Sequence, residues 1–112
     1  MFYKTEDSEK GIRKAVADKL TGEWKSVGGL MQQTTKTVEG AGVFKLNKSN
    51  DWVLMYDMYT SGRYQFTKGT DLEHFKVIDQ NVTMDFNPRH GTVMPITAKE
   101  AQKLRNRWLK AL

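Results

Sequence analysis

The chain has 112 residues, the length of a single domain, and its 38% hydrophobic and 28% charged residues are typical of a globular protein. It has no cysteine, which excludes disulfides, thiolate catalysis and cysteine-bound zinc, and no apolar run approaches the roughly 18 residues of a membrane span. The formal net charge of +5 comes from dispersed basic residues, so it favours a solvated basic surface over a nucleic-acid interface.

The first residues are polar from Lys4 onward, so no secretory signal is expected and the compartment stays open, with the cytoplasm as the default. Residues 2–7 then have an aromatic-rich strand pattern. The segment 12–20 is ambiguous, because its apolar residues also fit helical spacing. An internal repeat favours a strand there.

The repeat has a period of 51–52 residues. Gly11 corresponds to Gly62, and the other two pairs are Leu20 with Leu72 and Trp24 with Phe75. A repeat of this length built from strands is typical of a four-stranded propeller blade. The predicted units are an incomplete blade at 2–30, a complete blade at 37–80 and the inner strand of a next blade at 88–96.

Residues 98–111 are predicted to form a helix. Thr97 can cap it, and Glu100 stands at the capping-box position. Its apolar face is expected to pack on a sheet and consists of Ala101, Leu104, Trp108 and Leu112. The predicted fold is therefore all-β and mainly antiparallel: a single domain over 1–112, a partial β-propeller of about two four-stranded blades with a C-terminal α-helix.

Two strand openings carry the candidate site. Glu39 opens the predicted inner strand of the complete blade, and Gly40 and Gly42 after it leave room for a ligand or another backbone. His90 opens the next inner strand 51 residues later, so both side chains are expected to face one pocket. Arg89 beside it offers a planar donor fork for a carboxylate or for sugar hydroxyls.

Two aspartates receive structural interpretations. Asp71 is expected to order the turn before Leu72, and Asp57 is expected to end a strand.

Four stretches resemble glycoside hydrolase family 43: residues 2–25, 38–59, 69–77 and, most specifically, "FNPRHGTVMPIT" at 86–97. The resemblance implies a five-bladed β-propeller that acts on arabinose- and xylose-containing plant polysaccharides. It implies that Glu39 is the general acid, that Arg89 contacts substrate, and that His90 lies near the propeller axis. There His90 would bind substrate and be linked to a structural calcium ion or a water network.

The chain departs from the family pattern at two points. Ala41 replaces a usual proline, and the family's two catalytic aspartates belong to blades that precede the matching part. We therefore expect a truncated glycoside hydrolase-like protein with little or no hydrolysis by the isolated chain. The expected partners are a carbohydrate and either a second copy or another chain, because two blades leave sheet faces and edges open; neither nucleic acid nor a membrane is expected.

Two alternatives stay open. The first is a non-catalytic carbohydrate-binding or assembly module. The second is a nucleic-acid-binding domain in which Trp52, Tyr64 and Phe66 stack on bases.

Overall fold

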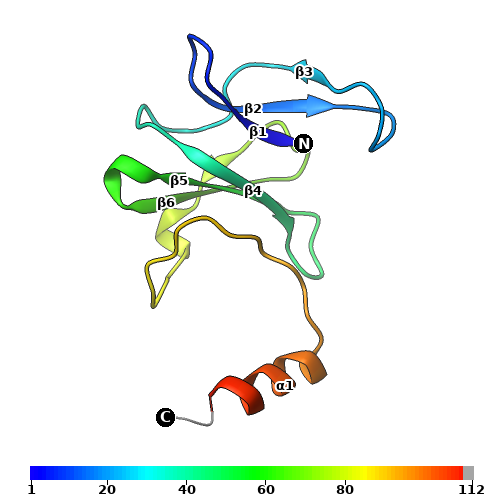
Figure 1. Cartoon of the computed structure of the whole chain (residues 1–112), viewed down its shortest axis with the longest axis vertical. Coiled ribbons are helices and arrows are strands. Elements are labelled where there is room, and N and C mark those ends of the chain that lie inside the picture. The colour runs from blue at the N-terminus through cyan, green and yellow to red at the C-terminus, as the bar shows by residue number, and fades with distance from the viewer. Residues whose placement is uncertain (110–112) are drawn as a thin grey trace.

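In the computed structural model, which describes residues 1–109, the chain forms two antiparallel sheets followed by one α-helix (Figure 1). The first sheet has the strands β1 (Phe2–Thr5), β2 (Gly11–Val16) and β3 (Lys25–Val27), in that order. The second has the order β4-β5-β6-β7, with the strands β4 (Glu39–Lys45), β5 (Trp52–Met58), β6 (Arg63–Gly69) and β7 (Lys76–Val77). The remaining elements are η1 (Tyr59–Ser61), η2 (Asp79–Asn81) and α1 (Ala98–Trp108). The mainly antiparallel β fold with a C-terminal helix is therefore confirmed.

The ambiguous segment 12–20 contains strand rather than helix. β2 pairs with β1 on one side, where Ile12 lies opposite Lys4, and with β3 on the other. Ladder bonds on both sides and the complete burial of Ile12 outweigh the helical spacing of the segment. β6 begins at Arg63, 52 positions after the start of β2 at Gly11, as the repeat predicted.

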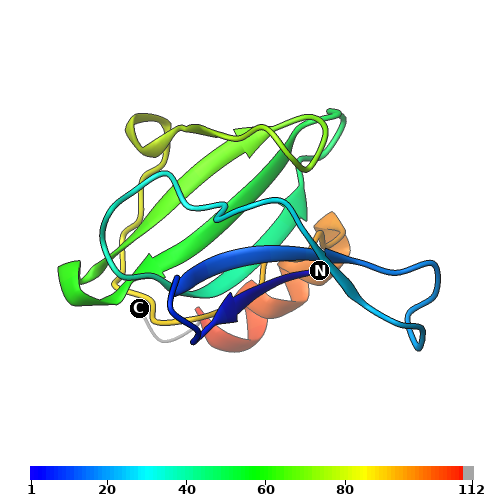
Figure 2. The ribbon, with the colours of Figure 1, turned by 90° about the horizontal axis from the view of Figure 1, so that it is seen from above.

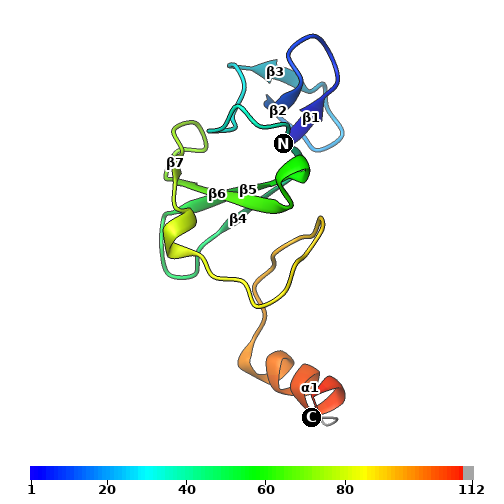
Figure 3. The ribbon, with the colours of Figure 1, turned by 90° about the vertical axis from the view of Figure 1, so that its left-hand side faces the viewer.

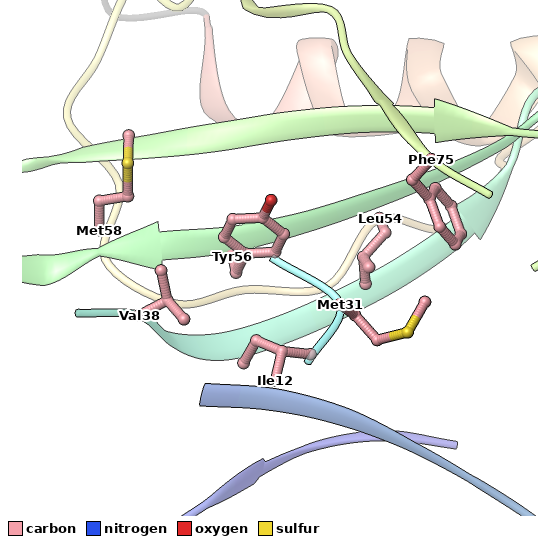
Figure 4. Close-up of a cluster of buried hydrophobic side chains, with 7 residues drawn as sticks. All are labelled: Ile12, Met31, Val38, Leu54, Tyr56, Met58 and Phe75. Atoms are coloured by element: carbon pink, nitrogen blue, oxygen red, sulfur yellow. The ribbon is translucent and has the colours of Figure 1, made fainter. Parts of the chain in front are cut away.

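The main core lies between the two sheets (Figure 4). β5 supplies its centre through alternate residues, because successive side chains of a strand point to opposite faces. Ile12 comes from the first sheet, and the full set is Ile12, Met31, Val38, Leu54, Tyr56, Met58 and Phe75. Figure 3 shows the three-stranded sheet stacked on the four-stranded sheet.

A second core covers the opposite face of the four-stranded sheet. Val53 and Met55 of β5 meet Tyr64 and Phe66 of β6, and residues after β7 pack against them. The burial of Tyr64 and Phe66 makes them core residues and leaves no ring face free for stacking on a base. The nucleic-acid alternative therefore loses two of its three aromatic residues.

The predicted strand at 88–96 does not form. These residues make no ladder pairing, His90 among them has a φ of 50°, and the next element within residues 1–109 is α1. The segment runs instead beside β4, where the carbonyl of Gly91 lies close to Gly42.

The capping box of α1 is confirmed, because the Thr97 hydroxyl accepts from the Glu100 backbone and the Glu100 carboxylate accepts from the Thr97 backbone. The predicted packing of its apolar face on a sheet is wrong: Leu104 is 52% and Trp108 72% exposed, and the helix buries no side chain. Both faces of the four-stranded sheet are already covered by the two cores, so neither is open to the helix. Figure 1 shows α1 apart from both sheets, and in the view from above in Figure 2 the helix lies behind the strands.

The predicted face residue Leu112 and the predicted helix end at residue 111 lie outside the described residues. Within residues 1–109, α1 is too short and too polar to cross a bilayer.

Candidate functional site

Glu39 is the first residue of β4, and its cross-strand partner on β5 is Asp57. Asp57 lies on the same face of β5 as Val53 and Met55, since the three positions are two residues apart. A carboxylate therefore lies on the face of β5 that carries apolar side chains at the two preceding positions. Its side chain is only 1% exposed.

A β-bulge shapes the start of β4. The pairing register shifts between Glu39 and Gly42, and Gly40 in between has a φ of +59°. A bulge with a glycine in the left-handed region bends the strand and redirects neighbouring side chains. The bare Cα of Gly40 also makes room for His90, because a Cβ at that position would lie 2.9 Å from Cδ2 of the imidazole.

The segment after η2 brings Arg89 and His90 to this bulge. His90 has a φ of 50°, which is uncommon for a residue with a side chain and is typical of sites that the surroundings hold in place. Its Nε2 lies 3.1 Å from Oε1 of Glu39 and 3.7 Å from Oδ2 of Asp57. The Nε of Arg89 donates to the same Oδ2 at 2.8 Å.

Lys4 reaches the cluster from the first sheet. Its ammonium group lies 3.7 Å from Oε2 of Glu39, 2.7 Å from Oε1 of Glu6 and 5.3 Å from the centre of the Tyr59 ring. The hydrogen bond to Glu6, followed by the nearby negative charges, raises the pKa of Lys4. The lysine therefore remains a cation that links both sheets at Glu39.

Buried groups lie behind the cluster. The second oxygen of Asp57, Oδ1, and the hydroxyl of Tyr64 are both buried and have no hydrogen-bond partner among residues 1–109. Tyr64 is the cross-strand neighbour of Asp57 on β6. Burial first, and then the charge of Asp57, raises the pKa of Tyr64, so its hydroxyl keeps its proton at neutral pH.

The structure brings together all three residues that the sequence predicted: Glu39, Arg89 and His90. Glu39 and His90 are in contact, although His90 does not open a strand as the repeat had predicted. Arg89 differs from the expectation in one respect, since one of its five donors is already bound to Asp57. A hollow of about 820 Å³ lies further along the same strand, between residues 43–50 and 93–95, and does not include the cluster.

Asp57 is the residue that sequence reasoning missed. The sequence predicts that it ends a strand, and it does lie one residue before the end of β5. A signal was present, because Asp57 is the only charged residue of the otherwise apolar run 52–59. A charge at a position that alternation assigns to the interior is a candidate for a paired functional group.

The carboxylates and the imidazole form a group in which one ligand atom from each residue lies within 4.8 Å of the others. This donor set does not fit a directly bound calcium ion, which takes six to eight oxygen ligands. Asp57 Oδ2 is already bound to Arg89, and His90 offers nitrogen rather than oxygen. A calcium ion linked to His90 through water stays a prediction.

The arrangement can exchange hydrogen bonds with a polyhydroxylated ligand. The side chains of Arg89 and His90 are 59% and 52% exposed, while that of Glu39 is 30% exposed. Donors on the Arg89 guanidinium and the acceptors of Glu39 therefore face solvent at one place, and the buried carboxylate of Asp57 lies behind them.

The model of a family described as "probable glycosyl hydrolase domain", which is related to glycoside hydrolase family 43, matches residues 1–102. The chain belongs to this family. The suspected relation to glycoside hydrolase family 43 is thereby confirmed. No curated protein and no solved structure is significantly similar to the chain. The match covers both sheets and the whole Glu39–Asp57–His90 cluster.

Because the chain belongs to a glycosyl hydrolase-like family, the spacing of its two carboxylates can be compared with that of a glycosidase active site. An inverting glycosidase needs two carboxyl groups about 6.5–9.5 Å apart, so that a water molecule fits between base and sugar. The carboxylate oxygens of Glu39 and Asp57 lie within 4.8 Å of each other, and Asp57 is buried against Arg89. These two carboxylates of the glycosyl hydrolase-like domain are therefore not placed as an inverting acid and base.

Proposed function

We propose that this glycosyl hydrolase-like domain binds arabinose- or xylose-containing glycans at Glu39, Arg89 and His90. We further propose that the isolated chain hydrolyses them slowly or not at all. The observation that carries the proposal is the contact of Glu39 with His90, 3.1 Å apart, inside a segment that matches the family. In this proposal Glu39 corresponds to the general acid, and Arg89 and His90 hold the sugar.

The lack of hydrolysis follows from the carboxylate pair. A general acid alone protonates the leaving group, but without a base on the other side of the sugar the attacking water is not activated. Asp57 is the carboxylate nearest in the ladder, and it is engaged with Arg89. Glycan binding without turnover is therefore the activity that these residues support.

We also propose that the two sheets are blades of an incomplete propeller. The support is the 52-residue step from β2 to β6 and the position of β4 next to β1. Open blade edges favour a second copy or another chain as a partner.

The test measures binding and turnover separately. Binding of arabinoxylo-oligosaccharides to the whole chain is followed by calorimetry and by amide chemical shifts. Turnover is followed with aryl arabinofuranoside and aryl xyloside. We expect saturable binding with shifts concentrated at Gly40 and Gly91, and hydrolysis no faster than in buffer.

Replacing one glutamate inside the site and one outside it tests whether the site binds the glycan. Glu39→Gln keeps the shape of the side chain but loses its charge and its ability to donate a proton, so it should weaken binding and leave hydrolysis at the buffer rate. Glu9→Gln is the matched control, because Glu9 forms an exposed ion pair with Arg13 instead. The proposal is wrong if no oligosaccharide binds, or if the wild type and Glu39→Gln both cleave the aryl glycosides equally fast and well above the buffer rate.

A third experiment measures glycan affinity with and without a chelator. Because the donor set does not fit a directly bound calcium ion, we expect the same affinity with calcium and with EDTA. Weaker binding in EDTA would instead support an ion near His90.

A further inference from the structure

Asp57 joins every part of the candidate site. It is the cross-strand partner of Glu39, the acceptor for Arg89 and a neighbour of His90. It reaches none of the solvent that a ligand would occupy, since its side chain is 1% exposed. A buried carboxylate is unfavourable unless it is paired, so its presence here requires a reason beyond packing.

We propose that Asp57 is a positioning residue of the glycan site: its buried carboxylate orients the Arg89 guanidinium and, together with the hydrogen bond of Glu39, favours one tautomer of His90. The proposal rests on the proposed function. Asp57 itself does not touch the ligand and acts through its two neighbours.

The effect on Arg89 follows from the geometry of the guanidinium. Its five N–H donors lie in one plane, and fixing Nε fixes the direction of the other four. The Nε is held by Asp57 at 2.8 Å while the side chain is 59% exposed. The terminal nitrogens are therefore presented to solvent in a set direction, where they can donate to two neighbouring sugar hydroxyls.

The effect on His90 follows from hydrogen-bond chemistry. Its Nε2 lies within hydrogen-bond distance of Oε1 of Glu39, at 3.1 Å, and Oδ2 of Asp57 adds a second negative oxygen at 3.7 Å. Ionised carboxylates only accept hydrogen bonds, so a neutral imidazole in this position must carry its proton on Nε2. Nδ1 is then left as an acceptor for a ligand hydroxyl.

Two features keep the ring in this orientation. His90 has a positive φ of 50°, and its imidazole lies against the backbone of Gly40, where a Cβ would come within 2.9 Å. The ring therefore has little freedom to turn away from the two carboxylates.

The experiment compares Asp57→Asn with Asp51→Asn in the whole chain. Asp51 is a suitable control because it also pairs with a cation within the four-stranded sheet, Lys68, at 2.9 Å. Three quantities are measured: the NMR signal of the Arg89 Nε–H, the protonated nitrogen of the His90 ring at mildly alkaline pH, and the affinity for arabinoxylo-oligosaccharides.

In the wild type and in Asp51→Asn we expect a slowly exchanging Arg89 Nε–H signal and a His90 proton on Nε2. In Asp57→Asn the amide can donate as well as accept, so the Nε–H signal should be lost to exchange and part of the His90 population should move its proton to Nδ1. Affinity should fall about tenfold, the lower end of the loss caused by removing a group that orients a metal-binding residue.

A proton on Nδ1 of His90 in the wild type would overturn the proposal. So would Asp57→Asn with unchanged Arg89 and His90 spectra. Should Asp57→Asn fail to fold, Arg89→Lys keeps the charge but loses the fork, and it should lower affinity while leaving His90 on Nε2. If the wild type binds no glycan, the proposed function fails, whereas the two spectra still decide whether Asp57 orients Arg89 and His90.

Discussion

At the scale of single residues, local hydrogen bonds hold polar side chains of this protein in defined positions. Asp71 is the clearest case. Its carboxylate accepts from the backbone N–H groups of Glu73 and His74, and its other oxygen lies 2.6 Å from Nδ1 of His74. This closes the turn in which Leu72 has a φ of 62°, so the expectation that Asp71 orders the turn is confirmed.

The Asp71–His74 pair predicts a pH dependence of stability. Hydrogen bonds from the backbone and ring of His74 hold the pKa of Asp71 well below its usual range, and the Asp71 carboxylate raises the pKa of His74. The depressed Asp71 pKa stabilises the fold above the ordinary value of about 3.9, and that stability is lost as pH falls. The raised His74 pKa stabilises the fold below about 6.5, and that stability is lost as pH rises through the folded value.

The pair should therefore contribute most between about pH 4 and 6.5. We expect His74→Ala to lower the free energy of unfolding near pH 5.5 and to have a smaller effect at pH 8.5, as measured by urea denaturation. The effect should be small, because both side chains are exposed to solvent. A deficit that grows from pH 5.5 to 8.5 would contradict the assignment.

At the scale of elements, the bulge at the start of β4 decides where the site residues meet. A regular strand would continue the alternation of Glu39 through Lys45 without a break. The register shift after Glu39 and the left-handed Gly40 interrupt it, and the imidazole of His90 lies in the space beside the glycine. The bulge thus makes the room in which His90 lies next to Glu39.

Gly40→Ala tests this link. An alanine there adopts a left-handed φ, which costs about 1–2 kcal/mol, and its Cβ would also lie 2.9 Å from Cδ2 of His90. Gly28→Ala separates the two effects, because Gly28 has a φ of +71° but no atom within 4 Å of its Cβ position. We expect Gly40→Ala to destabilise the fold more than Gly28→Ala and to shift the His90 ring signals. Equal losses and unchanged His90 signals would show that the close contact is unimportant.

At the scale of the whole molecule, the sheets and the helix behave as separate parts. The two cores join the sheets to each other, while α1 buries no side chain (Figure 1). Besides Leu104 and Trp108 of α1, the exposed apolar residues include Val43 on β4 and Val93, Met94 and Ile96 on the segment just before α1. Exposed apolar residues of this kind favour association between chains.

Removal of residues 98–112 tests both points. Because α1 packs on neither sheet, the shortened chain should unfold at the same temperature as the full chain at low concentration. The full chain should self-associate in sedimentation experiments at high micromolar concentration, and the shortened chain should do so less. A clean monomer of the full chain would contradict the association, and a large fall in the unfolding temperature would show that α1 supports the sheets.

The sequence by itself determined the features that depend on neighbours along the chain or on the repeat. Alternation and turn residues predicted the strands, and the capping box predicted α1. The 51-residue period placed Glu39 and His90 at one pocket, but through a strand at 88–96 that does not form. Only the tertiary structure decided that Asp57 belongs to the site, because its partner Arg89 is 32 residues away and no periodic pattern joins them. It also decided that 88–96 pairs with no strand and that α1 packs on neither sheet. Such outcomes depend on which sheet faces and strand edges remain free after the cores have formed, a property of the assembled fold that no local pattern encodes.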